Sequence, residues 1–200
     1  MTFDLSESFQ LHIANLQLKD VYSAVFGTQE TKIPFFVWLL ENPESPLSLP
    51  GRICLRHHDY IHILLGRGIS FQDEAFVIGF TMGNDSEIKK IHLWTYKFFA
   101  KFIYPHPYKF HELDLLIFDL GFQYGKKIKF KCINKINFEL YQNESINYLR
   151  NLFGINLEEI KLIQQFESWL LTEFSNSDVF QVNKAPFHNL VQLLDIFGKN

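Results

Sequence analysis

The sequence predicts an all-α protein that folds as a single compact multi-helix domain. Apolar residues recur at helical spacing along most of the chain, and strand-like alternation is brief. Prolines and glycines mark the breaks between the helical stretches. The chain has 200 residues, of which 47% are hydrophobic and 16% aromatic, so it is long enough to bury a large core.

The first expected helix covers roughly residues 9–26, where leucines and valines recur at helical intervals until Gly27. A short helix is predicted over residues 33–40, because that run is apolar and ends at a proline-rich segment. The prolines make residues 41–51 a loop.

Two helices are predicted next, over residues 53–65 and 71–82. Both are largely apolar, and Gly66 and Gly68 interrupt the chain between them. Ser70 is expected to cap the second helix, because a serine hydroxyl can accept a hydrogen bond from the first free backbone amides.

The following stretch is strongly aromatic and is predicted to be a helix that Ser86 caps and that Pro105 ends. Another helix is expected over residues 113–127. Only residues 130–134 alternate in the manner of a strand, and that run is too short to change the fold class.

The C-terminal part is predicted to hold a short helix before residue 155 and then helices over residues 157–174 and 188–197. We therefore divide the chain into a main helical domain, residues 1–155, which holds the candidate functional residues given below, and a C-terminal helical extension, residues 156–200, that packs on it.

Charge and cysteine content exclude several classes of function. The formal net charge is −3 and no basic run stands out, so nucleic acid is not an expected partner. Two distant cysteines, Cys54 and Cys132, make a disulfide framework improbable.

The N-terminus lacks a signal-peptide pattern, and no apolar run approaches the ~20 residues of a membrane span. We expect a cytoplasmic protein that is soluble or peripheral on the membrane.

A group of histidines and acids in the expected helix 53–65 has the spacing of a metal site. His58 and His62 lie about 40° apart around a helix, and Asp59 also falls within an arc of about 100°. In an antiparallel helical hairpin, Glu74 lies at the same level as His62. Two imidazoles and up to two carboxylates suit zinc, and also manganese or iron. An isolated pair of histidines at this spacing is often a surface accident, but the two acids make a site the better interpretation.

These residues also resemble a known family signature. In residues 58–74, the sequence H-D-Y-I-H is followed by eleven residues and then Glu74. This segment is similar to the H-D-x-x-H-(x)11-E signature of the coenzyme Q biosynthesis family, whose founding member is the fourth yeast coenzyme Q protein. DLGFQYGKKI (119–128) resembles the small-residue helix of that family, and SINYLRNLFGI (145–155) resembles its closing segment. The usual tryptophan is absent, and residues 139–141 occupy its place. The resemblance ends near Ile155.

The resemblance implies a function in ubiquinone or quinone biosynthesis. The family is all-α, associates peripherally with membranes and holds a polyprenyl lipid in an apolar cavity between helices, with its head group at a metal. One role is removal of the head-group carboxyl at ring carbon one, coupled to hydroxylation; another is that of a non-catalytic scaffold for the other quinone biosynthesis proteins.

Carried over to this chain, the resemblance makes His58, Asp59, His62 and Glu74 the ligands of one divalent ion. Zinc is preferred, and magnesium, manganese and iron are alternatives. Asp59 and His62 are then the expected catalytic residues, with Asp59 either a ligand or a proton-transfer group. A homodimer is plausible because apolar helices are expected at the surface.

Further residues are predicted to contact the lipid. Arg56 and Arg67 could hold an anionic head group, or could equally be solvent-facing residues at helix ends. Trp94, Phe98 and Phe102 belong to a helix that is apolar on more than one side, and such a helix packs in a core or lines an apolar cavity.

Two other classes of metal enzyme are weighed against this interpretation. A zincin-like hydrolase would use Asp59 as its base, but aspartate is shorter than the usual glutamate. An HD-type phosphohydrolase would need further ligands, for which His12, Asp114 and Asp119 are the only loose candidates. A di-iron bundle would need a second acid-x-x-His segment, which is missing from the sequence.

Overall fold

The protein is helical throughout its described part. The computed structural model describes residues 7–27, 35–106 and 108–176. In these ranges there are nine α-helices, a π-helical turn and two 3-10 turns, and no strand; the closest feature to a strand is an isolated bridge between Gln17 and Ser145. The all-α prediction is therefore confirmed.

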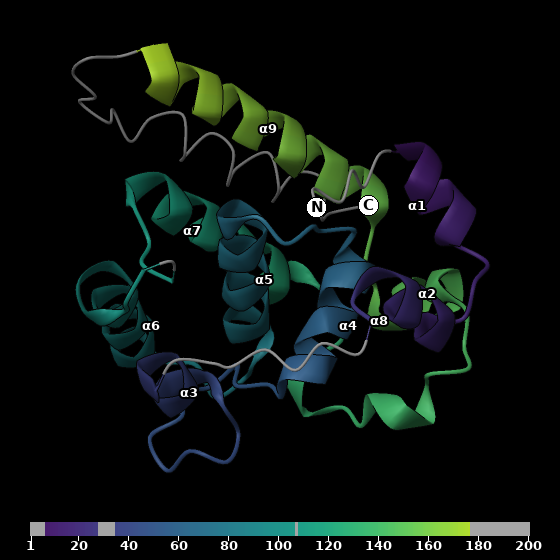
Figure 1. Ribbon diagram of the computed structural model, residues 1–200, viewed down its shortest axis with the longest axis horizontal. Helices are drawn as coiled ribbons and strands as arrows, with labels where there is room; N and C mark the ends of the chain where they lie inside the picture. Colours follow the sequence, from purple (N-terminus) through teal and green to yellow (C-terminus); the bar gives the residue numbers. More distant parts are fainter. Residues whose placement is uncertain (1–6, 28–34, 107, 177–200) are drawn as a thin grey trace.

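The elements follow one another in this order: α1 (Glu7–Ile13), α2 (Leu18–Val25), α3 (Phe35–Glu41), α4 (Leu55–Leu65), α5 (Phe71–Asn84), α6 (Lys90–Phe98), the π-helix η1 (Phe99–Ile103), α7 (Glu112–Lys127), the 3-10 turns η2 (Ile133–Lys135) and η3 (Phe138–Leu140), α8 (Ile146–Phe153) and α9 (Leu157–Asn176). Figure 1 shows α5 near the centre, with α6 and α3 on one side and α4, α8 and α2 on the other. The long helix α9 runs along one edge of these elements.

Helices α5 and α7 pack backbone against backbone. Each carries two glycines four residues apart, and the four are Gly79, Gly83, Gly121 and Gly125. A Cβ atom on Gly121 would lie 2.1 Å from the carbonyl oxygen of Phe76, and one on Gly83 would lie 2.1 Å from that of Phe122. The absence of side chains at these positions is therefore what allows the two helices to approach so closely.

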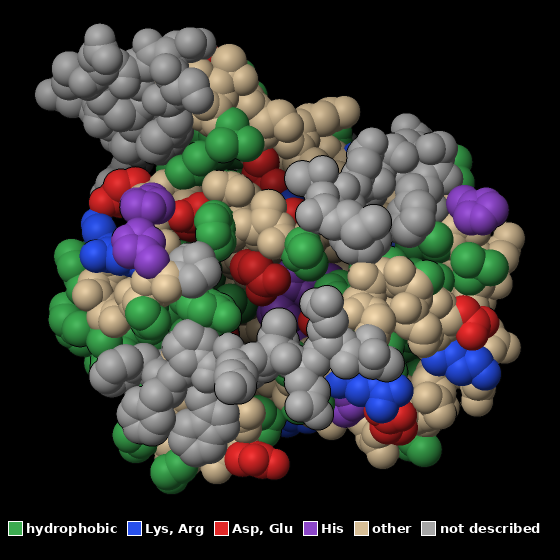
Figure 2. Space-filling view, viewed as in Figure 1, with side chains coloured by type: hydrophobic (Ala, Val, Ile, Leu, Met, Phe, Trp, Pro, Cys, Tyr) green, Lys and Arg blue, Asp and Glu red, His purple; other side chains and the backbone are tan. Residues whose placement is uncertain are grey.

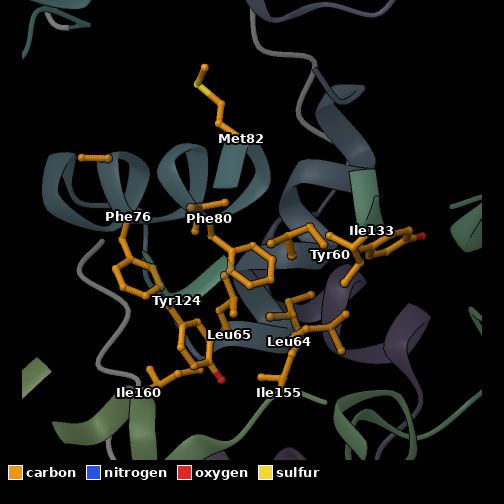
Figure 3. Packing of buried hydrophobic residues seen from close by; sticks show 14 of the residues in the cluster. Tyr60, Leu64, Leu65, Phe76, Phe80, Met82, Tyr124, Ile133, Ile155 and Ile160 are labelled. Atoms are coloured by element: carbon orange, nitrogen blue, oxygen red, sulfur yellow. The ribbon is translucent and has the colours of Figure 1, made fainter. Parts of the chain in front are cut away.

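Large apolar side chains fill the space between this helix pair and α4. Tyr124 of α7 packs against Phe76 and Phe80 of α5, with ring centroids 6.3 and 5.9 Å apart. Leu64 and Leu65 of α4 are fully buried beside them (Figure 3). The core thus fixes α4 relative to α5, which positions the histidines of α4.

Two buried arginines connect distant parts of the chain to the end of α4. Arg150 of α8 donates hydrogen bonds to the carbonyl oxygens of Ile63 and Leu64, which satisfies groups that a helix C-terminus leaves free. Arg67 forms a two-bond ion pair with Glu167 of α9, at 2.6 and 2.9 Å. The described part of the expected extension therefore packs on the domain, while the predicted helix 188–197 lies outside the described residues.

Two element predictions are wrong in detail. The expected helix over residues 9–26 is two helices, because residues between them bond to a distant segment: the amide of Leu18 donates to Glu144, and that of Ile146 donates to Leu16. Ser86 does not cap α6, which begins after Lys89. The other predicted helices within the described residues agree with α3, α4, α5, α7, α8 and α9 to within a few residues at their ends.

Candidate metal centre

The connection between α4 and α5 is built from the signals expected of a helical hairpin. Gly66 ends α4 with a left-handed φ of 61°, which glycine adopts without steric cost. Ser70 caps α5, and its side chain accepts a hydrogen bond from the amide of Asp73 while Asp73 bonds back to Ser70. His62 thus lies one turn before the break and Glu74 one turn after the cap, so the two side chains face each other.

The structure brings three of the predicted residues together. Ligand atoms of His58, His62 and Glu74 all lie within 4.8 Å of one another. Nε2 of His58 is 3.6 Å from one carboxylate oxygen of Glu74, and Nε2 of His62 is 3.4 Å from the other. Figure 2 shows histidine and acidic side chains together in a recess between α5 and α4. This arrangement could hold a metal ion.

The hydrogen bonding of His62 suits a metal ligand. The side chain is fully buried, and Nδ1 lies 2.6 Å from the carbonyl oxygen of Gly68. If Nδ1 carries the proton and donates it to that carbonyl, the lone pair of Nε2 is free to bind an ion. Nε2 is buried and has no hydrogen-bond partner in the described part of the chain. Because a buried polar atom without a partner is costly, an ion at this point would remove the cost.

The charges of the group also favour a cation. Burial alone would raise the pKa of Glu74, but His62 and His58 hold it at about 2, so this carboxylate stays ionised. Burial lowers the pKa of His58 to about 4, so its imidazole is neutral at pH 7. For His62, burial acts to lower the pKa, but the charges of Glu74 and Asp59 outweigh burial and raise the pKa above its usual value.

Asp59 is placed differently from the other three. It is half-buried and is not part of the group whose ligand atoms converge. Burial raises its pKa to about 7, against the opposing charge of His62. A carboxyl with a pKa in this range can hold or release a proton near neutral pH, which fits the proton-transfer alternative better than direct ligation.

No model of a known protein family, no curated protein and no solved structure matches the chain. The resemblance to the coenzyme Q family therefore stays a prediction. What can be inferred about function rests on the geometry of this group and on its surroundings.

The two arginines predicted near the head group already have protein partners. Arg56 is exposed. Its Nη1 lies 3.1 Å from Oε1 of Glu139, and its Nε donates a hydrogen bond to the hydroxyl of Tyr60. Arg67 is 3% exposed and lies over the ring of Phe76, so the solvent-facing alternative is wrong for it. Contact of either residue with a lipid stays a prediction.

The three predicted aromatic residues form an exposed stripe along α6 and η1. Trp94, Phe98 and Phe102 are 64%, 40% and 59% exposed. The ring of Phe98 stacks on Trp94 at 5.6 Å and packs on Phe102 at 5.4 Å. These residues therefore lie on the surface, and the aromatic residue of α6 that points into the core is Tyr96.

The ligands that an HD-type phosphohydrolase would add are not part of the group. Asp119 is paired with Lys97, and Asp114 accepts hydrogen bonds from Gln72 and the amide of His111. His12 is exposed on α1. The structure thus gives no support to this rival.

A second polar cluster near the metal group was missed in the sequence. It consists of Glu41, at the end of α3, with Tyr96 and Tyr104. No motif could have revealed it, because Glu41 lies more than fifty positions before the two tyrosines and none of the three has a characteristic spacing to the histidines.

Proposed function

We propose that the protein binds a divalent metal ion through His58, His62 and Glu74, and that this ion holds the polar head of a polyprenyl precursor in quinone biosynthesis. The observation that carries the proposal is the buried Nε2 of His62, which forms no well-aligned hydrogen bond to a described residue and lies 3.4 Å from an ionised carboxylate. Two imidazoles and one carboxylate leave ligand positions open for a head group, as catalytic zinc sites do.

The surroundings of the group support an apolar ligand. Phe26 lies against His62 with ring centroids 6.4 Å apart, and Tyr60 and Phe76 are fully buried on the two helices that carry the ligands. Apolar side chains around a few converging polar groups are typical of sites that hold a small organic molecule or lipid. The spacing of the four motif residues adds the specific suggestion of a quinone precursor.

Residues of this chain could support the step in which the head-group carboxyl leaves as CO2, whereas the coupled hydroxylation would also need an oxidant such as dioxygen. When bound, the ion would supply Lewis-acid stabilisation of a developing negative charge. Asp59, with its pKa near 7, would hold or release the proton that such a step requires. Without that step, the same site would serve a non-catalytic scaffold that binds the lipid and releases it unchanged.

The test combines metal analysis with mass spectrometry of intact lipids on the purified protein. We expect about one divalent ion per chain and a co-purifying isoprenoid lipid, and we expect Glu74→Gln to lose most of both. Turnover of a carboxylated polyprenyl phenol would identify an enzyme, and its unchanged release a scaffold. A protein that binds no divalent ion, or takes up no isoprenoid lipid, would contradict the proposal.

A lipid ligand also requires access to a membrane. No helix in the described ranges combines the length and apolarity needed to cross one. The stripe formed by Trp94, Phe98 and Phe102 offers a peripheral alternative, because exposed aromatic side chains at helical spacing can insert into the headgroup region.

Replacing Trp94, Phe98 and Phe102 together with serine is expected to reduce binding to anionic liposomes at least about tenfold in a flotation assay. The matched control is Leu140→Ser, which removes a side chain that is 77% exposed on a different element. Equal flotation of the triple variant and the control would show that the stripe does not touch the membrane.

A further inference from the structure

The cluster missed in the sequence lies where α3, α6 and the end of η1 meet. The hydroxyl of Tyr104 donates a 2.9 Å hydrogen bond to Oε1 of Glu41. Tyr104 is 4% exposed and Glu41 is half-buried. Figure 1 shows α3 next to α6, in agreement with this bond. A carboxyl group is thus drawn into an apolar, aromatic region by a tyrosine.

Tyr96 brings a second hydroxyl to the same place. Its ring is held firmly by stacking on Phe118 at 5.1 Å and by edge contacts with Tyr104 and Phe110. The side chain is 1% exposed, and its hydroxyl interacts with Glu41 without forming a well-aligned hydrogen bond to any described residue. A buried hydroxyl without a hydrogen-bond partner is unfavourable, so a ligand that completed the bonding of this hydroxyl would bind more tightly.

Both groups are close enough to Glu74 for the charge of that carboxylate to act on them. Burial raises the pKa of Glu41 to about 8; the hydrogen bond from Tyr104 opposes this rise, and the negative charge of Glu74 adds to it. Burial also raises the pKa of Tyr96, and the charges of Glu41 and Glu74 act in the same direction. Burial therefore favours the neutral form of the Glu41 carboxyl, and a neutral carboxyl can both donate and accept a hydrogen bond.

We propose that Glu41 and Tyr96, with Tyr104 holding Glu41 in place, form a hydrogen-bonding subsite for a hydroxyl group on the end of the ligand that is remote from the metal. The inference rests on the proposed function, because it places the other end of the head group at His58, His62 and Glu74. A phenolic hydroxyl matches the subsite: it donates to the carbonyl oxygen of Glu41 and accepts from the hydroxyl of Tyr96. The subsite would then select hydroxylated aromatic acids over those that lack the hydroxyl.

The test uses two ligands that differ only in that hydroxyl, 3-geranyl-4-hydroxybenzoate and 3-geranylbenzoate. Their Kd values are measured by calorimetry on the zinc-loaded full chain. We expect the wild type to bind the hydroxylated ligand about tenfold more tightly. A factor of this size is the typical contribution of one ligand hydroxyl that finds hydrogen-bond partners in the protein. We expect this ratio to fall to about 1 in Tyr96→Phe and in Glu41→Leu.

The control is Tyr124→Phe, which removes another buried tyrosine hydroxyl, one that is bonded to the backbone of Asn156. It should keep the tenfold ratio, and if Glu41→Leu does not fold, Tyr96→Phe alone decides. A wild type that binds both ligands equally, or a Tyr96→Phe variant that keeps the ratio, overturns the subsite and leaves the proposed function intact. A chain that takes up zinc but neither ligand, or no zinc at all, overturns the proposed function and the subsite with it.

Discussion

Replacing Gly121 with alanine is expected to prevent the protein from reaching a stable fold. The added Cβ would lie 2.1 Å from the carbonyl oxygen of Phe76, a distance at which backbone must move. Helix α5 cannot simply retreat, because Gly79 and Gly83 hold it equally close to α7. Overpacking in a rigid core costs about 1–3 kcal/mol when side chains can adjust. A clash with backbone exceeds that range, so we expect a loss above about 4 kcal/mol, measured by denaturant unfolding.

Gly27→Ala is the matched control. A Cβ at Gly27 meets nothing within 4 Å, so the substitution adds only the strain of its left-handed φ of 64°. That strain is worth about 1 kcal/mol. If Gly121→Ala cost no more than Gly27→Ala, the close contact of α5 with α7 would be wrong.

The parts of the fold that follow from local signals could be predicted. Ser70 and Gly66 lie where a helix cap and a helix end were expected, because both act on the backbone a few residues away. The break between α1 and α2 could not be predicted in the same way. It depends on backbone bonds from Leu18 and Leu16 to the segment around Ser145, more than 120 positions later.

The same distinction applies to the site. His58, His62 and Glu74 converge because helical spacing and a short hairpin fix their positions. Asp59 was expected at the edge of the same arc, about 100° from His58, and it is the one of the four predicted residues that lies outside the ligand group. Arg67 was expected to be near a head group or in solvent, but Glu167 buries it as an ion partner 100 positions away. The sequence contains no signal for such a distant pairing.

His62→Ala is expected to weaken zinc binding at least about 100-fold, measured by competition with a chromogenic chelator. His62 supplies the only one of the three ligands that is fully buried. Its Nδ1 lies 2.6 Å from the carbonyl oxygen of Gly68, a contact that orients the ring toward the other two ligands. Without it, His58 and Glu74 leave only two protein ligands, fewer than the three of a typical catalytic zinc site.

His57→Ala is the control, because its ring stacks on Tyr60 and packs against Phe138, outside the ligand group. It should bind zinc as the wild type does. A thermal readout separates lost binding from lost folding: zinc at 100 times its Kd stabilises a chain that binds it only when folded by about 2.7 kcal/mol. The wild type and His57→Ala should therefore melt at a higher temperature with zinc. In His62→Ala a 100-fold weaker Kd leaves the same zinc concentration a stabilisation of at most about 0.4 kcal/mol, so its melting temperature should rise far less. A rise of equal size in His62→Ala would place the ion elsewhere in the chain and remove the support for the proposed function.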